Sequence, residues 1–161
     1  MNIFETIWKF ISGMFGVAIE RPSPSDILPW EALTYYEVGN KVEINLWRLP
    51  FSMTEQPNVR FCALANTGSM DPVMDAEHNS ILIAGKKPAD HQLLVDWLFA
   101  QEPGNIAVYE TLNLRAIHRV VSKGIDKDGE YLRFKGDNNP VMDSSKVRKQ
   151  HIEWVSIGVI Y

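Results

Sequence analysis

The chain has 161 residues, which fits one domain or one domain with a short appended element. The formal net charge of −4 and the scattered lysines and arginines argue against a nucleic-acid-binding surface, which needs clustered positive charge. The one cysteine, Cys62, excludes a disulfide within the chain, and the four histidines lack paired metal-ligand spacing, so no metal or cofactor is predicted.

Residues 1–20 have the pattern of a strongly amphipathic helix with a wide, aromatic-rich apolar face. Glu5 and Lys9 interrupt the apolar run, and the uncharged stretch 10–19 is about half as long as a bilayer span requires. Two interpretations stay open: the helix lies in a membrane interface as a peripheral anchor, or it docks on the protein's own body or on a partner subunit. These place the protein at a membrane or in the cytoplasm.

An Arg-Pro-Ser-Pro-Ser segment at residues 21–25 stops this helix and forms a stiff connector. The chain therefore divides into an N-terminal helix with its connector, residues 1–25, and a body, residues 26–161.

The body reads as one mainly β domain, because apolar and polar residues alternate in short runs separated by turn residues. Residues 126–129 have the composition of a hairpin turn. We expect the last strand to close the sheet. Strands are predicted at residues 42–49, 59–65, 80–84, 106–109, 114–121, 131–134 and 151–161.

One segment, residues 89–101, departs from the strand pattern and predicts an inserted helix that Pro103-Gly104 ends. Its apolar side is expected to carry four residues: Leu93, Leu94, Trp97 and Leu98.

The strand that begins at Val59 runs into a tight turn, Asn66-Thr67-Gly68-Ser69-Met70-Asp71-Pro72. Glycine frees the backbone for the turn and proline fixes its exit, so Ser69 is presented at a strand end. On its own this motif is typical of any turn.

Two later segments give this serine possible partners. A lone histidine, His118, lies inside an apolar strand, and its neighbour Arg119 is expected to be solvated on the opposite strand face. Further on, Lys135-Gly136-Asp137-Asn138-Asn139 and Asp143 place two acids around a turn.

In this order, the motifs at 69–72, 118–120 and 135–139, with Asp143 following, resemble type I signal peptidases of the endoplasmic-reticulum and archaeal kind. The resemblance covers roughly residues 59–143 and the closing strand. It implies a β-ribbon fold shared with LexA-type peptidases, and a serine endopeptidase that cleaves an extended polypeptide, such as a signal peptide or propeptide, after small residues.

Matched to that family, Ser69 corresponds to the nucleophile and His118 to its general base. A serine hydroxyl needs such a base, and a carboxylate can orient the imidazole. Asp143 corresponds to the acid of the site and Asp137 to the acid of the turn, and either can support His118. The Ser69 backbone N–H and the Thr67 hydroxyl are the expected oxyanion donors.

The chain also departs from the family. His78-Asn79-Ser80 and Gly104-Asn105 stand where family members carry Gly-Asp turns, and an amphipathic helix replaces the usual transmembrane anchor. The inserted helix at 89–101 is expected to border the substrate cleft.

Two other functions are alternatives for this sequence. A self-processing LexA-like regulator needs lysine where this chain has His118, and residues 21–57 offer no Ala-Gly cleavage site. A non-catalytic binding or assembly module on the same fold is the other alternative.

Overall fold

The computed structural model describes residues 30–36, 39, 41–74, 78–112 and 114–160. The amphipathic segment 1–20 and the connector 21–25 lie outside the described residues. Among the helices that the structure describes, none is long and apolar enough to cross a bilayer. The elements, in chain order, are η1 (Trp30–Ala32), β1 (Leu33–Tyr36), β2 (Lys41–Ile44), η2 (Leu46–Arg48), β3 (Asn58–Ala63), β4 (Asn79–Ala84), α2 (Pro88–Ala100), β5 (Ile106–Thr111), β6 (Leu114–Asp126), β7 (Gly129–Lys135), η3 (Lys149–His151) and β8 (Ile152–Ile160).

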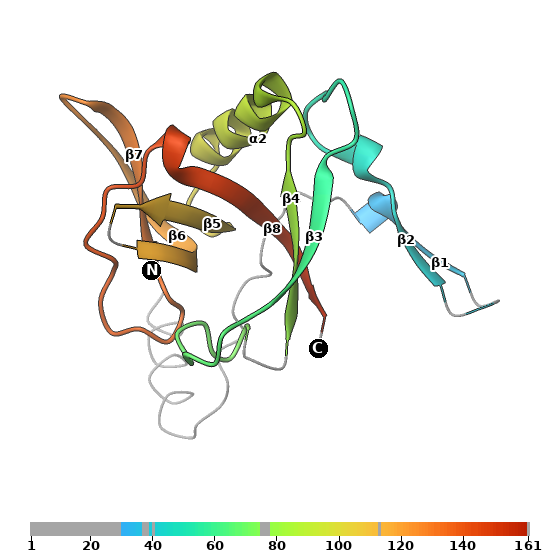
Figure 1. Ribbon diagram of the computed structural model, residues 1–161, viewed down its shortest axis with the longest axis horizontal. Helices are drawn as coiled ribbons and strands as arrows, with labels where there is room; N and C mark the ends of the chain where they lie inside the picture. The colour runs from blue at the N-terminus through green and yellow to red at the C-terminus, as the bar shows by residue number, and fades with distance from the viewer. Residues whose placement is uncertain (1–29, 37–38, 40, 75–77, 113, 161) are drawn as a thin grey trace, which may run out of the picture.

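Six of the strands form one antiparallel sheet in the order β3-β4-β8-β5-β6-β7, which confirms a mainly β body. The last strand was expected to close the sheet, but β8 lies at its centre, between β4 and β5 (Figure 1). Three consecutive residues of β8, Val155, Ser156 and Ile157, are buried, as a strand covered on both faces requires. The two halves of the sheet are therefore joined by the end of the chain.

The predicted strand at 42–49 is only half correct, because β2 ends at Ile44. The Asn45 side chain accepts a hydrogen bond from the Trp47 N–H (3.1 Å) and starts the turn η2. β2 pairs with β1, a strand that was not predicted, and the two form a separate hairpin that projects to the right in Figure 1.

The helix predicted at 89–101 is confirmed within one residue as α2, Pro88–Ala100. Its buried side differs from the prediction, since Leu93 is 40% exposed, whereas Leu94, Val95, Leu98 and Phe99 are buried. Apolar residues occupy most of the helix circumference, so their spacing does not specify which side faces the sheet. α2 lies at the top of the molecule in Figure 1, at the far end from the loop that follows β3.

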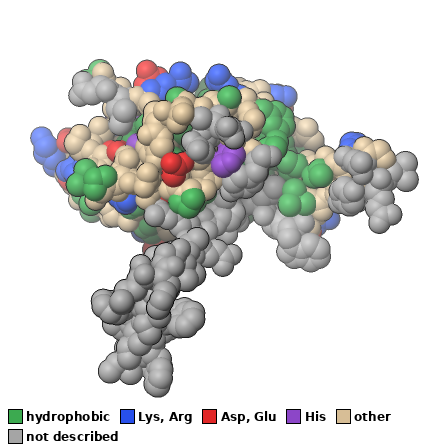
Figure 2. Space-filling view, turned by 90° about the horizontal axis from the view of Figure 1, so that it is seen from below, with side chains coloured by type: hydrophobic (Ala, Val, Ile, Leu, Met, Phe, Trp, Pro, Cys, Tyr) green, Lys and Arg blue, Asp and Glu red, His purple; other side chains and the backbone are tan. Residues whose placement is uncertain are grey.

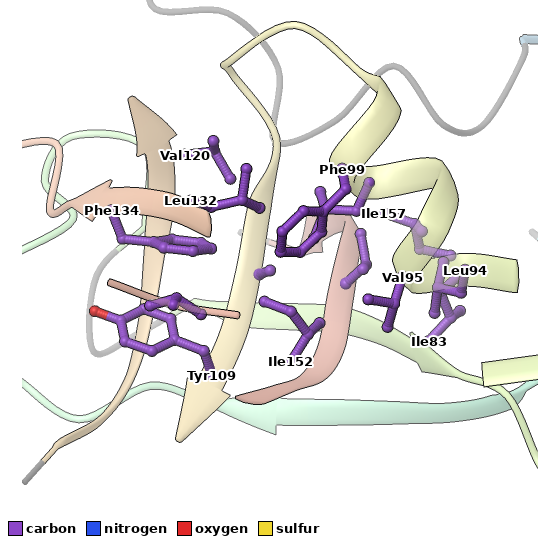
Figure 3. Close-up of a cluster of buried hydrophobic side chains, with 14 of the residues drawn as sticks. Ile83, Leu94, Val95, Phe99, Tyr109, Val120, Leu132, Phe134, Ile152 and Ile157 are labelled. Carbon is purple, nitrogen blue, oxygen red and sulfur yellow. The ribbon is translucent and has the colours of Figure 1, made fainter. Parts of the chain in front are cut away.

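The main core lies between α2 and the sheet (Figure 3). Ile83, Leu94 and Leu98 are at most 2% exposed within it, and each such side chain contributes about 1.5–3 kcal/mol by leaving water. The Tyr109 and Phe134 rings pack together with centroids 4.4 Å apart.

The hairpin turn predicted at 126–129 is confirmed, with Asp126 paired to Gly129 at the junction of β6 and β7. The Asp126 carboxylate accepts hydrogen bonds from Lys146 Nζ (2.6 Å) and from Arg148 Nη2 (2.8 Å). These donors, Lys146 foremost, lower the pKa of Asp126 to about 2. The Asp126 carboxylate therefore links the β6–β7 hairpin to residues 146–148, which precede β8.

Replacing Asp126 with Asn should lower the melting temperature at pH 7, because the ion pairs with Lys146 and Arg148 are lost. The native pKa lies below that of the unfolded chain, so this stabilisation is present above about pH 4 and disappears as the pH falls to about 2. Thermal melts of wild type and variant at pH 7, 4 and 2 measure it. The more exposed Asp128, changed to Asn, serves as control, and a difference that persists at pH 2 would contradict the explanation.

Candidate active site

Ser69 lies in the loop between β3 and β4, half-buried at the surface. Gly68 before it has a φ of +62°, in the left-handed region that favours glycine. Met70 and Met74 after it are 4% and 1% exposed and pack with Ile106 in a second small core. The serine is thus presented outward by a loop that is held by buried neighbours on one side.

Three of the predicted site residues form a continuous row of hydrogen bonds. His118 Nε2 lies 3.3 Å from Ser69 Oγ, and His118 Nδ1 lies 2.7 Å from Asp143 Oδ2. The imidazole and the carboxylate are 10% and 11% exposed. With the proton on Nδ1, the ring donates to the carboxylate, and Nε2 is free to accept from the serine hydroxyl.

The second acid, Asp137, belongs to a different pair. Arg119 Nε and Nη2 each donate to one of its carboxylate oxygens at 2.8 Å, and Arg119 Nη1 donates to the Gly104 carbonyl. Arg119 was predicted to be solvated, but it is buried at 7% exposure, because the pair neutralises its charge. Both ring nitrogens of His118 already have partners, so the structure brings Asp143 to the histidine and Asp137 to the arginine.

The two expected oxyanion donors lie side by side. The Thr67 hydroxyl oxygen is 3.0 Å from Ser69 Oγ, and the Ser69 backbone N–H donates to Thr67 Oγ1 at 3.4 Å. Thr67 is exposed. Both donors therefore stand next to the serine oxygen, and in this arrangement they bond to each other.

The turn that contains Asp137 also holds the serine loop. The Asn138 backbone N–H donates to the Ser69 carbonyl, and its side-chain amide donates to the Gly68 carbonyl, both at 2.9 Å. A Cβ on Gly136 would come within 2.5 Å of the Ser69 carbonyl oxygen, so only glycine fits there. Nothing local in the sequence indicates this contact between Asn138 and a residue 69 positions away.

Tyr109 is a further residue that the sequence did not indicate. Its hydroxyl donates to Asp143 Oδ2 at 2.5 Å. Burial, together with the hydrogen bond to the carboxylate, raises the pKa of Tyr109 far above its ordinary value. In the sequence Tyr109 is one more residue of an apolar strand, and no local pattern points to Asp143.

A cavity of about 340 Å³ opens beside the serine. A second cavity of about 230 Å³ continues from it across the face of the sheet. No residue of α2 lines either cavity. The expectation that this helix borders the cleft beside Ser69 is therefore wrong. The five residues shared by both cavities are Leu64, Ala65, Arg115, Ala116 and Ile117. On the face of the molecule seen in Figure 2, basic side chains are spread along the edges.

No family model, curated protein or solved structure matches this chain. Within the described part of the chain, no three His, Cys, Asp or Glu side chains group as metal ligands. What the site can do is therefore argued from its own geometry. A serine hydroxyl, an imidazole and a carboxylate in one hydrogen-bonded row have the arrangement that a nucleophile, its general base and an orienting acid require.

Replacing Asp137 with Asn should lower the free energy of unfolding by about 3–5 kcal/mol, because a buried guanidinium loses its counter-ion. Urea unfolding at pH 7 measures it. Asp143→Asn is the matched control and should cost clearly less, because the partners of that carboxylate, His118 and Tyr109, are not obligate cations. Equal losses in the two variants would contradict the division of the two acids between arginine and histidine.

Proposed function

We propose that the chain is a serine endopeptidase with a signal-peptidase-like β-ribbon fold. Ser69 is its nucleophile, His118 its general base and Asp143 the acid that orients the base. The observation that carries the proposal is the row of hydrogen bonds from Ser69 Oγ through the imidazole to Asp143 Oδ2. The Ser69–His118 distance of 3.3 Å is slightly long, as is common before substrate tightens such a contact.

In the first step, Ser69 Oγ attacks the carbonyl carbon of the scissile peptide bond while its proton passes to His118 Nε2. The carbonyl oxygen takes the negative charge, and the Ser69 N–H and the Thr67 hydroxyl turn from each other toward it. Donors placed where charge develops stabilise the transition state more than the ground state. Asp143 accepts the Nδ1 hydrogen bond and stabilises the imidazolium that forms.

In the second step, the imidazolium gives its proton to the leaving nitrogen, the C–N bond breaks, and an ester of Ser69 remains. Water then attacks this ester and passes a proton to His118, the serine oxygen leaves and takes a proton back, and the carboxylic acid product forms. No group beyond the side chains and water is required. The chemistry is complete with the residues described.

The substrate is an extended polypeptide. The two joined cavities form a groove that leads away from Ser69 between β3 and the start of β6, and an extended strand fits such a groove by adding to a sheet edge. Ala65 and Ala116 line the part of the groove that both cavities share. The resemblance adds an expectation of small residues before the scissile bond, as in signal peptides or propeptides.

Residues 1–20 supply the second part of the proposal. Their amphipathic pattern brings the site either to a membrane surface or to a partner subunit. Activity is therefore expected to depend on lipid if the segment binds a membrane.

Wild-type protein should cleave members of a mixed peptide library in the presence of lipid vesicles, and Ser69→Ala and His118→Ala should each lose about 10³-fold or more in rate. Mass spectrometry of the products measures rate and specificity together. His151→Ala, which removes a histidine outside the row, is the matched control and should keep the wild-type rate. A folded wild-type protein no more active than Ser69→Ala would overturn the proposal in favour of a binding or assembly module.

Replacing Thr67 with Val removes the hydroxyl but keeps the shape, and should lower kcat about 10²–10³-fold with little change in KM. Thr67→Ser keeps the donor and should retain most of the rate. Thr34→Val, on the exposed face of β1, controls for the chemistry of the change. If Thr67→Val lowers only the affinity, the hydroxyl binds substrate and does not stabilise the oxyanion.

A further inference from the structure

One oxygen atom of Asp143 receives two donors. His118 Nδ1 lies 2.7 Å from Oδ2, and the Tyr109 hydroxyl lies 2.5 Å from the same atom. Figure 3 shows the Tyr109 ring beside Phe134, with its hydroxyl at the outer end, directed away from the apolar cluster. The row at the active site is therefore one residue longer than Ser69, His118 and Asp143.

Tyr109 is held rigidly enough to act as a fixed donor. It is 0% exposed in the middle of β5, paired to Ala116 on one side and Ile152 on the other. Its ring packs on Phe134 at a centroid distance of 4.4 Å. Burial, together with the hydrogen bond to Asp143, raises the pKa of the Tyr109 hydroxyl, so the hydroxyl keeps its proton near neutral pH.

Asp143, in contrast, lies outside the strands, in the chain that follows β7. Its backbone N–H donates to the Phe134 carbonyl at 2.8 Å, which fixes the main chain but leaves the side-chain rotamer free. A carboxylate on such a segment needs a second contact to keep facing the imidazole. The Tyr109 hydroxyl supplies that contact from a central strand.

We propose that Tyr109 is a positioning residue of the active site: its hydroxyl holds the Asp143 carboxylate toward His118 and takes up part of the carboxylate's negative charge. This inference rests on the proposed function, in which the carboxylate orients and stabilises the histidine. Without the Tyr109 hydroxyl, the shared oxygen would keep more of its negative charge where it faces the imidazole.

Other charged groups face this region but are unchanged by a substitution at Tyr109. They are Arg115 in the cavity wall, Asp71 beside Gly68, Arg133 on the carbonyls of residues 143 and 144, Lys135 at the Gly136 turn, and the Arg119–Asp137 pair. A change in the titration of His118 in a Tyr109 variant therefore reports the lost hydroxyl.

The first experiment follows the His118 ring by NMR as a function of pH, in the full chain and without substrate, with His118→Ala to assign the signal. Tyr109→Phe keeps the ring and removes only the donor, and should move the titration of His118 up by about 0.5–1 pH unit. Tyr131→Phe, which removes a hydroxyl from β7 away from the site, should leave it unchanged. An unchanged titration in Tyr109→Phe overturns the inference.

The second readout is catalytic. Tyr109→Phe should lower kcat about tenfold with little change in KM, and should move the acidic limb of the pH–rate profile to higher pH. In an Asp143→Asn background the same change should have no further effect, because the two residues act through one contact. A purely structural role would lower stability without moving the acidic limb, and would leave the two effects additive.

The two readouts separate this inference from the proposed function. If wild type cleaves no peptide, the peptidase proposal fails, while the NMR titration still decides whether Tyr109 acts on the Asp143–His118 pair. If Tyr109→Phe does not fold, full replacement of the five tyrosines by 3-fluorotyrosine keeps the packing and makes the hydroxyl a stronger donor. The titration of His118 should then move to lower pH, and no movement overturns the inference.

Discussion

Strand β6 carries His118 and Arg119 next to each other, and the pleat of a strand sends adjacent side chains to opposite faces. This alternation organises the whole site. His118 meets Asp143, and Arg119 meets Asp137, although the two acids are close together in the chain. One pair is hydrogen-bonded beside Ser69. The other neutralises a buried guanidinium and anchors the turn that holds the serine loop.

The Asp137 turn connects stability to geometry. Its ion pair with Arg119 is buried, and a buried pair holds its geometry only because both charges and their hydrogen bonds are satisfied. In the same turn, Asn138 donates to the Gly68 and Ser69 carbonyls, which lie on either side of the Ser69 Cα. The Asp137 turn therefore helps to fix the position of Ser69.

Much of the fold could be predicted from local patterns. Strands β3 to β7 and the helix α2 were located to within a few residues, except that β6 runs on to Asp126, because period-two alternation and turn residues reflect local backbone chemistry. Strand β1, its pairing with β2 and the central position of β8 were missed. Strand order depends on which strand edges pair across long loops. The sequence of residues 155–157 is compatible with several strand orders, so it does not place β8 at the centre of the sheet. The exposed Leu93 of α2 was misplaced for a related reason, since a helix apolar on most sides has no unique face.

The sequence by itself determined which residues are candidates for the site, since three motifs in order indicated Ser69, His118 and a nearby acid. It also determined that the body is mainly β, since short alternating runs cannot bury an apolar stripe as helices. Only the tertiary structure decided that Asp143 serves His118, that Asp137 serves Arg119, and that Tyr109 reaches the shared oxygen. These contacts join positions 18 to 34 residues apart. Their geometry is set by strand register and loop closure, which no local pattern encodes.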